Sequence, residues 1–211
     1  MNFDLLRHKM VTEQLVRRGI HNPRVLEAMG RVPREKFVPP TLLHKAYDDC
    51  ALPIAFEQTI SQPFTVAFMC QEARLQETDT VLEIGTGSGY GAAVLAHLAQ
   101  AVHTVERIPD LYQLAGDRLR VLGYHNVRLH LGDGSLALPH EAPFDAIVCT
   151  AGAEHLPLAY QEQLTDGGRL VIPIGPPGSQ TMYRLTRLGD HWHGDNLGGF
   201  GFVPLVSDDG D

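Results

Sequence analysis

Two hydrophobic patterns divide this chain of 211 residues. Up to about residue 75 the apolar residues recur at helical spacing, as Leu6 with Met10 and Val11 with Leu15 illustrate. The same stretch contains helix boundary signals: Gly19 ends the first segment, and Asn22-Pro23 is typical of a helix start. We therefore expect a helical extension, with a proline-broken loop and one short helix over residues 31–40. The expected helices of this extension cover residues 2–18, 22–29 and 63–75.

From Thr80 onwards, apolar runs with the length of strands alternate with helical patterns. Strands are expected over residues 80–84, 101–106, 126–131, 145–149, 169–174, 182–187 and 200–205, and helices over 90–99, 109–122 and 157–164. Repeated strand–helix–strand units require a mostly parallel sheet with helices on both faces. The last two expected strands have no helix between them, so they predict an antiparallel C-terminal edge. The sequence therefore predicts an α/β fold of the doubly wound, Rossmann-like type.

Residues 46–62 show no sustained periodicity. A long ordered connection inside a compact domain is more often functional than idle, so this segment is a candidate part of the site. It ends in Ser61-Gln62-Pro63, where a serine can cap the following helix or can contact a ligand. Chemistry alone favours the cap, and no G-x-S-x-G motif marks Ser61 as a nucleophile.

A glycine-rich stretch follows the first strand of the sheet. Gly85, Gly87 and Gly89 alternate after Glu83, whereas the G-x-G-x-x-G dinucleotide fingerprint would need glycine at position 90, where this chain has Tyr90. A negative charge on Glu83 would repel a pyrophosphate and would suit the cationic or amino end of a sulfonium cofactor. This loop therefore favours an S-adenosylmethionine site over a dinucleotide site.

Acidic residues stand at the ends of three successive strands: Glu83, Glu106 and Asp133. Ligands of open α/β sheets bind at the carboxyl ends of the strands, and an acid after the second strand can accept hydrogen bonds from ribose hydroxyls. An acid after the third strand can accept one from the exocyclic amine of an adenine. Each residue alone could be a solvated or turn residue, and Gly132-Asp133-Gly134 is good turn chemistry. Together, in register, they favour cofactor binding.

Composition excludes several other classes of protein. The net charge is −8 and the basic residues are scattered, so no nucleic-acid partner is expected. Three widely spaced cysteines suggest a reducing compartment, and neither His191-Trp192-His193 nor His140-Glu141 has metal-site spacing, so no metal is expected. The N-terminus lacks a basic segment followed by an apolar one, and no apolar run approaches 18 residues. We therefore expect no signal peptide, no membrane span and a cytoplasmic location.

Several motifs together resemble the protein-L-isoaspartate O-methyltransferase family, over roughly residues 5–206. The segment Thr59-Ile60-Ser61-Gln62-Pro63 is the specific mark, whereas the glycine loop is shared by many methyltransferases. The further matching motifs are Val32-Pro33-Arg34-x-x-Phe37-Val38, Ala46-Tyr47, Glu83-Ile84-Gly85-Thr86-Gly87-Ser88-Gly89-Tyr90, Leu122-Gly123-Tyr124-x-Asn126-Val127, Gly132-Asp133-Gly134, Ala142-Pro143-Phe144-Asp145-Ala146-Ile147, Gly167-Gly168-Arg169-Leu170-Val171 and Val203-Pro204-Leu205.

This resemblance implies an enzyme that repairs damaged proteins, by moving a methyl group from S-adenosylmethionine to the α-carboxyl of L-isoaspartyl residues. It also implies a role for each matching residue. Ser61 would contact the substrate carboxylate, with Thr59 and Ile60 beside it; Gly85, Thr86, Gly87 and Ser88, next to Glu83, would wrap the cofactor; Glu106 would hold the ribose; and Asp133 with Gly134 would meet the adenine. We expect one methyltransferase domain over residues 1–211, acting as a monomer, with an N-terminal extension and substrate segment over 1–75 and a cofactor-binding core over 76–211.

The chain departs from the family pattern at Ala55, Glu57 and Ala137, where glycine is frequent. A carboxylate at Glu57 would weaken binding of an anionic substrate if it faced the site. Two alternatives remain open from the sequence. One is a methyltransferase that acts on a small molecule and differs only over residues 46–62; the other is a non-catalytic module that captures isoaspartyl proteins.

Overall fold

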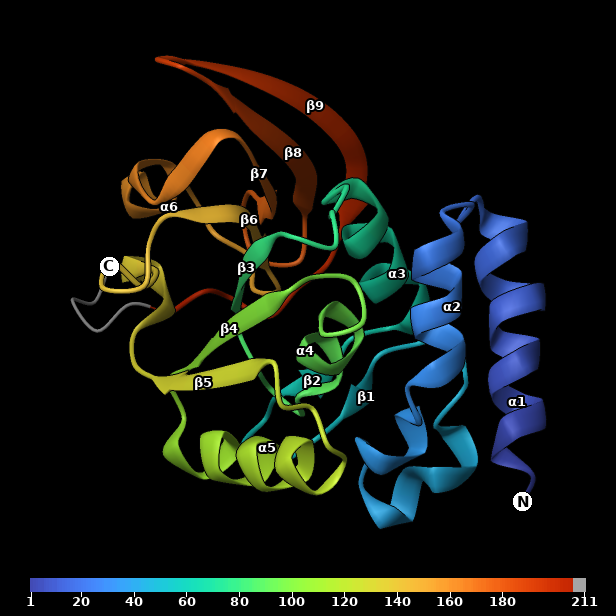
Figure 1. Cartoon of the computed structure of the whole chain (residues 1–211). Helices are drawn as coiled ribbons and strands as arrows, with labels where there is room; N and C mark the ends of the chain where they lie inside the picture. The colour runs from blue at the N-terminus through green and yellow to red at the C-terminus, as the bar shows by residue number, and fades with distance from the viewer. Residues whose placement is uncertain (207–211) are drawn as a thin grey trace.

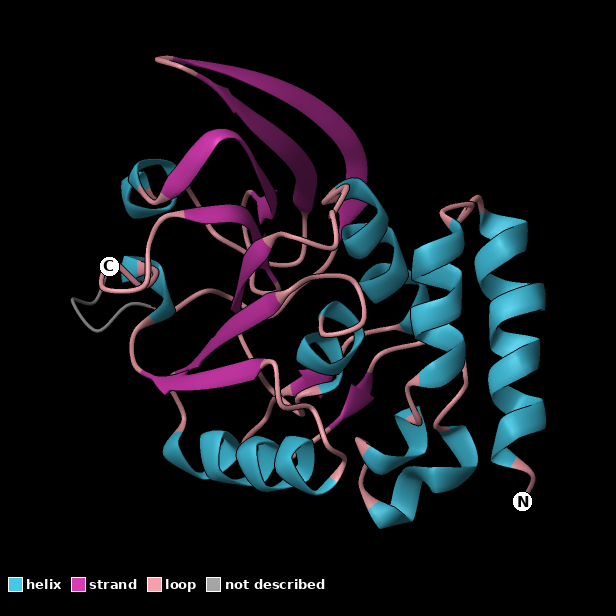
Figure 2. Cartoon of the chain, viewed as in Figure 1, coloured by secondary structure: helices cyan, strands magenta, loops and turns pink. Residues whose placement is uncertain are grey.

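The computed structural model describes residues 1–206 and contains a seven-stranded sheet flanked by helices (Figures 1 and 2). The strand order is β5-β4-β3-β6-β7-β8-β9. The first five strands in this order are parallel, whereas β8 and β9 are antiparallel to their neighbours. This arrangement confirms the predicted Rossmann-like sheet with an antiparallel C-terminal edge. The strands cover β3 (Thr80–Ile84), β4 (Ala101–Glu106), β5 (Val127–Leu131), β6 (Phe144–Cys149), β7 (Leu164–Ile174), β8 (Gln180–Leu188) and β9 (His191–Phe200).

The last predicted strand, over residues 200–205, is wrong. Strand β9 ends at Phe200 and forms a long curved hairpin with β8 through a turn at Gly189, whose φ is +60° (Figure 1). An edge strand needs no continuous apolar run, so the polar, glycine-rich sequence of β9 hides it from a hydrophobic search. Residues 201–205 instead cross to Gly152, which donates to the Val203 carbonyl and accepts from Leu205 N.

The predicted helices after β3, β4 and β6 are present as α4 (Tyr90–Leu95), α5 (Pro109–Val121) and the short α6 (Leu158–Glu162). A single-turn 3₁₀ segment, η5 (Gly134–Leu136), follows β5, where the sequence predicted no helix. Observed α4 ends earlier than the predicted 90–99, because the chain tightens after it: His97 N donates to the Val94 carbonyl and Leu98 N to the Leu95 carbonyl, three residues back instead of four. Within residues 1–206, none of the helices has both the length and the hydrophobicity that a membrane crossing requires.

The predicted helical extension is present at the N-terminus. Helix α1 (Phe3–Lys9) continues without a break as a π-helical segment (Met10–Leu15) and a 3₁₀ turn (Val16–Arg18) and ends at Gly19. Helix α2 (Pro23–Arg31) begins at Asn22, whose side chain accepts from the N–H groups of Arg24 and Val25. Helix α3 covers Pro63–Glu72, and two 3₁₀ turns, Arg34–Lys36 and Pro40–Lys45, lie between α2 and the segment predicted to be irregular.

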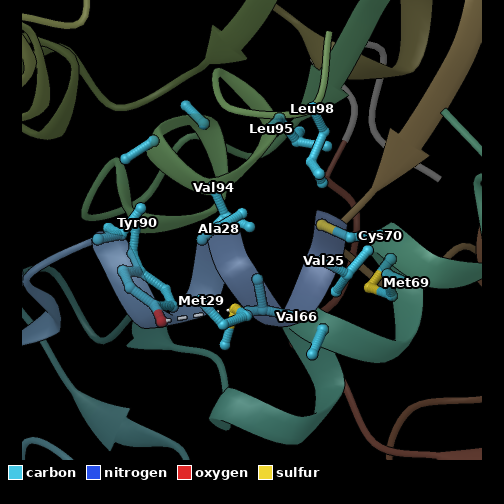
Figure 3. Close-up of a cluster of buried hydrophobic side chains, with 14 of the residues drawn as sticks. Val25, Ala28, Met29, Val66, Met69, Cys70, Tyr90, Val94, Leu95 and Leu98 are labelled. Carbon is cyan, nitrogen blue, oxygen red and sulfur yellow. Dashed lines mark hydrogen bonds between the residues drawn. The ribbon is translucent and has the colours of Figure 1, made fainter. Parts of the chain in front are cut away.

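Two apolar layers hold the helices against the sheet. On one face, α2, α3 and α4 pack together through Val25, Met29, Val66 and Val94, and the Tyr90 hydroxyl lies 3.7 Å from the Met29 sulfur (Figure 3). On the other face, β-strand residues pack with α6, whose Tyr160 is fully buried. These layers fix the carboxyl ends of β3, β4 and β6 in a rigid frame, and that is where the site lies.

Residues 46–62 contain a small hairpin that the sequence did not predict. Strand β1 (Leu52–Pro53) pairs with β2 (Thr59–Ile60), with Leu52 opposite Ile60. Phe56 and Glu57 form the turn with φ values of +58° and +57°, a backbone conformation that normally selects asparagine and glycine. The hairpin carries Ser61 towards the sheet.

Candidate active site

A cleft of about 930 Å³ opens at the carboxyl ends of β3, β4 and β6. The glycine loop and the end of β4 form one wall, residues 58–62 form a second, and residues 199–206 form a third. The first two walls touch: a Cβ built on Gly87 would lie 3.9 Å from the Thr59 carbonyl oxygen. Thr59 of the irregular segment and Gly87 of the glycine loop, 28 residues apart in the chain, therefore line one cleft.

The glycine loop turns sharply over the end of the sheet. Gly85, Gly87 and Gly89 have φ values of +93°, +53° and +88°, which other residues adopt only with strain. The N–H groups of Gly85 and Thr86 both donate to the Val105 carbonyl of β4, at 3.0 and 3.2 Å. This bond pair holds the loop against β4, so its main chain can lie close to a ligand.

Glu106 connects the end of β4 to the glycine loop. Its side chain is 6% exposed; Oε2 accepts from Gly87 N at 2.8 Å and Oε1 accepts from Ile108 N at 3.0 Å. Each carboxylate oxygen has a second lone pair, so Glu106 can accept further hydrogen bonds from the cleft. Glu106 lines the cleft wall at the end of its strand, and its contact with a ligand stays a prediction.

Glu83 differs from the expected anion. It is 1% exposed, faces the α3–α4 layer, and accepts a hydrogen bond from the Thr104 hydroxyl at 2.6 Å. Burial raises the pKa of Glu83 to about 8, with a smaller contribution from the charge of Glu106. Glu83 is therefore mostly neutral at pH 7, and it does not supply the negative charge that the sequence argument assigned to it.

Gly91 makes room for this buried carboxyl. A Cβ on Gly91 would lie 2.1 Å from Glu83 Oε1, closer than any two such atoms can approach. Thr86 and Thr104 complete the network, their hydroxyl oxygens 2.6 Å apart. The glycines of the loop thus serve two purposes: Gly85 and Gly87 turn the main chain at the cleft, and Gly91, which also lines the cleft, leaves space for the Glu83 carboxyl.

Asp133 occupies the turn position that the sequence also allowed. It is the N-cap of η5, and its carboxylate accepts from Ser135 N at 2.8 Å. Gly134 lines the cleft, packed so closely on Ile84 that a Cβ would lie 2.6 Å from the Ile84 Cγ2. Contact of Asp133 with an adenine stays a prediction.

Ser61 precedes helix α3 without capping it. The N-cap is Gln62, α3 has no side-chain cap, and within residues 1–206 the Ser61 hydroxyl makes no hydrogen bond to another residue. Thr59, Ile60 and Ser61 all line the cleft, Ile60 with its side chain buried at 3% exposure. The hydroxyl is therefore available for a ligand, and the capping alternative does not describe this serine.

The three departures from the family pattern fall in two places. Glu57 is exposed at the hairpin turn and does not line the cleft, so the one sequence feature that favoured a non-catalytic binding module is not part of the site. Ala137, with φ of +53°, and Glu57, with φ of +57°, both adopt conformations that favour glycine. Ala55 precedes the turn.

Arg34 lies behind the residues that line this cleft, and the sequence interpretation missed it. It is 0% exposed, and its Nη2 donates to the Ser61 carbonyl at 2.8 Å. It belongs to a matching motif, Val32-Pro33-Arg34, but no local pattern indicated that it contacts Ser61, which lies 27 residues further along the chain. A second residue that the sequence interpretation missed is Arg18, at the mouth, which pairs with Asp49 at 2.6 Å and stacks over Phe64.

A group of side chains away from the cleft has ligand atoms close enough for a metal ion. His103, His130 and Glu141 have such atoms within 4.8 Å of one another. His103 Nδ1 lies 3.1 Å from His130 Nε2, in the range of a hydrogen bond, and burial lowers the pKa of both rings. A neutral, hydrogen-bonded pair accounts for this geometry.

Comparison with known proteins identifies a matching family. The family model of protein-L-isoaspartate(D-aspartate) O-methyltransferase matches residues 6–210. Similar proteins include the protein-L-isoaspartate O-methyltransferases of Protochlamydia amoebophila (strain UWE25), 51% identical over 95% of this chain and 97% of its own, and of Dictyoglomus thermophilum, 50% identical over 97% of this chain and 92% of its own.

Two solved structures have a similar fold over nearly the whole chain. A protein-L-isoaspartate O-methyltransferase superposes with a TM-score of 0.85 at 28% identity, covering 97% of this chain and 67% of its own. A Plasmodium falciparum protein described as a protein-L-isoaspartate O-methyltransferase, in complex with S-adenosyl-L-homocysteine, superposes with a TM-score of 0.82 at 25% identity, covering 98% and 99%.

Proposed function

Because this chain belongs to the protein-L-isoaspartate(D-aspartate) O-methyltransferase family, we propose that the cleft between the glycine loop and residues 58–62 is its active site. The enzyme transfers a methyl group from S-adenosylmethionine to the α-carboxyl of L-isoaspartyl residues in damaged proteins, as part of their repair. The observation that carries the assignment is the free Ser61 hydroxyl, in a segment that contacts Gly87 of the glycine loop.

The cofactor half of the cleft would be formed by the glycine loop and the ends of β4 and β5. Gly85, Thr86, Gly87 and Ser88 would wrap the cofactor, with the neutral Glu83 carboxyl beneath them, and Asp133 with Gly134 would meet its adenine. The free lone pairs of the Glu106 carboxylate suit two ribose hydroxyls. A cleft of about 930 Å³ lies in the size range of cofactor sites, so the residues present fit the group.

The acceptor half would be formed by Thr59, Ile60 and Ser61. When bound, S-adenosylmethionine supplies a methyl group that is already activated by the sulfonium. The acceptor carboxyl is ionised at pH 7, so the chain does not have to remove a proton. Its task is to orient the carboxylate and exclude water. A serine hydroxyl suits this task because it can donate a hydrogen bond to the carboxylate without neutralising it.

Several further features of the enzyme belong to the same proposal. The described chain works as one methyltransferase domain, supported by the apolar layer that α2 and α3 share with α4 and the sheet. The acceptor is a protein or peptide rather than a nucleic acid, in keeping with the net charge of −8. A monomer would suffice for activity, since residues of a single chain form all three described walls of the cleft. A cytoplasmic location suits three widely spaced cysteines.

The test is the replacement Ser61→Ala. A hydrogen bond to a charged group is worth about 1.5–3 kcal/mol, so turnover of an isoaspartyl peptide should fall roughly 10- to 150-fold. The affinity for S-adenosylhomocysteine, measured by calorimetry, should stay within about twofold, because Ser61 lies in the acceptor half. Ser179→Ala, at an exposed serine in the β7–β8 turn, is the matched control and should change neither quantity. Unchanged methyl transfer by Ser61→Ala would reject the role of Ser61.

A further inference from the structure

Arg34 places a positive charge beneath the acceptor half of the cleft. Its side chain is 0% exposed, although arginine is almost never fully buried without a charged partner. Nε donates to the Ala46 carbonyl at 2.8 Å and Nη2 donates to the Ser61 carbonyl at 2.8 Å. The third nitrogen, Nη1, is buried with no hydrogen-bond partner within residues 1–206.

No carboxylate of residues 1–206 forms an ion pair with this guanidinium. The acid next to it in sequence, Glu35, is already paired: it accepts from the Tyr47 hydroxyl at 2.5 Å and lies 3.3 Å from Arg7 Nη2. The ring of Tyr90 lies beside the guanidinium, its centroid 4.7 Å from the Arg34 Cζ, and Tyr47 and Cys50 are also near enough to interact with it. Arginine stays protonated in proteins, so a full, unneutralised charge is buried here.

The positive charge of Arg34 is close to the Ser61 hydroxyl, the group that would contact the substrate carboxylate. Bond lengths limit the separation between the Ser61 carbonyl oxygen and its own hydroxyl, so that hydroxyl lies within about 8 Å of Arg34 Nη2. Tyr90 and Ser61, both in contact with Arg34, line the cleft. Burying an unpaired charge destabilises a protein, and an anionic ligand would reduce that cost.

We propose that Arg34 is a positioning residue that holds the Ser61 main chain and makes this half of the cleft selective for an anionic acceptor over a neutral one. The inference rests on the proposed function, because it takes Ser61 as the acceptor contact. In the reaction a carboxylate oxygen forms a bond to the methyl carbon while the carbon–sulfur bond breaks and its electron pair stays on sulfur. The acceptor thereby loses its negative charge, so the same residue favours binding of the substrate and not of the ester product.

The charge acts on acceptor binding more than on the chemical step. Transfer cancels the negative charge of the carboxylate, so a nearby cation stabilises the bound substrate at least as much as the transition state. Loss of the charge should therefore raise KM for the acceptor more than it lowers kcat. A unit charge that acts across several ångströms at a protein's effective dielectric is worth about tenfold or more in affinity.

The experiment compares two peptides on protein saturated with S-adenosylhomocysteine. One contains L-isoaspartate, and the other contains the neutral isoasparagine in its place. Wild-type protein should bind the carboxylate peptide about tenfold or more tightly than the amide peptide. In Arg34→Met the ratio should fall to within about threefold, and Arg34→Lys, which keeps the charge without the planar fork, should restore most of it.

Arg24→Met is the matched control, because Arg24 also donates to two main-chain carbonyls, but these belong to Leu75 and Leu98 rather than to a residue that lines the cleft. It should keep the wild-type ratio. Equal weakening of both peptides in Arg34→Met would show a purely structural role and overturn the proposal. Equal binding of both peptides by wild type would overturn it without any variant, even where methyl transfer is normal. Binding of neither peptide by an active, cofactor-saturated wild type would instead reject the acceptor assignment of the cleft.

Discussion

Replacing Gly91 by alanine should destabilise the protein, although alanine is the better helix former. Gly91 is the second residue of α4, and its new methyl group would lie 2.1 Å from Glu83 Oε1. That oxygen belongs to a flexible side chain, but the carboxyl is 1% exposed and its other oxygen accepts from Thr104. It cannot move without breaking that bond or displacing the α3–α4 layer.

The magnitude follows from three contributions. Overpacking costs about 1–3 kcal/mol, loss of the Thr104 hydrogen bond costs about 1–3 kcal/mol, and helix propensity returns at most about 1 kcal/mol. We expect a net loss of about 1–5 kcal/mol in the free energy of unfolding, which lowers Tm by roughly 2–20 °C in a protein of this size.

The assay is thermal and urea unfolding followed by circular dichroism. Gly116→Ala in α5 is the matched control, since its nearest atom would be Leu129 Cδ2 at an ordinary 3.7 Å. That variant should gain up to about 1 kcal/mol from helix propensity. The double variant Glu83→Ala/Gly91→Ala should lose less free energy of unfolding than the two single variants summed, because the carboxyl that clashes with the new methyl group is gone. A Gly91→Ala protein with the same Tm as the wild type would refute the reasoning.

Two further predictions concern stability. Burial raises the pKa of Glu83 from 4.5 to about 8, so between these pH values the folded state holds a proton that the unfolded chain has lost, and the free energy of unfolding should fall as pH rises. In Glu83→Gln, urea-unfolding midpoints measured from pH 5 to pH 8 should depend less on pH. The same pH dependence in the variant and the wild type would contradict the assignment. Glu57→Gly should stabilise the hairpin by about 1 kcal/mol, because Glu57 has a φ of +57°, whereas Glu57→Ala keeps the backbone strain and should not stabilise it. Neither variant should change KM for an isoaspartyl peptide. A lower KM in Glu57→Ala would show that the carboxylate faces the site.

The local sequence pattern was sufficient to predict a strand where the strand is buried on both faces and its own residues are therefore apolar. The run Thr80–Ile84 is mostly apolar because parallel strands are covered on both faces, with Glu83 as its acidic exception, and the strand was predicted at its observed bounds. The polar strand His191–Phe200 has no such cover and was missed. Edge strands are defined by pairing with a neighbour rather than by their own composition.

The site was predictable in its parts but not in its electrostatics. Glu106 and Ser61 were found because each stands at a motif, and the structure brings both to one cleft. The neutral state of Glu83 depends on burial by α3 and α4, and the role of Arg34 depends on Ala46 and Ser61, 12 and 27 residues away. Charges of buried groups follow from tertiary packing, which a linear motif does not encode.

Labelled methyl transfer to matched peptides tests the central claim most directly. Purified protein is incubated with S-adenosylmethionine labelled in its methyl group and with peptides that differ only in containing L-isoaspartate or L-aspartate. Base-labile label should appear in the isoaspartyl peptide, as a methyl ester, and not above background in the aspartyl peptide. Equal labelling of both peptides, or labelling of neither, would contradict the account.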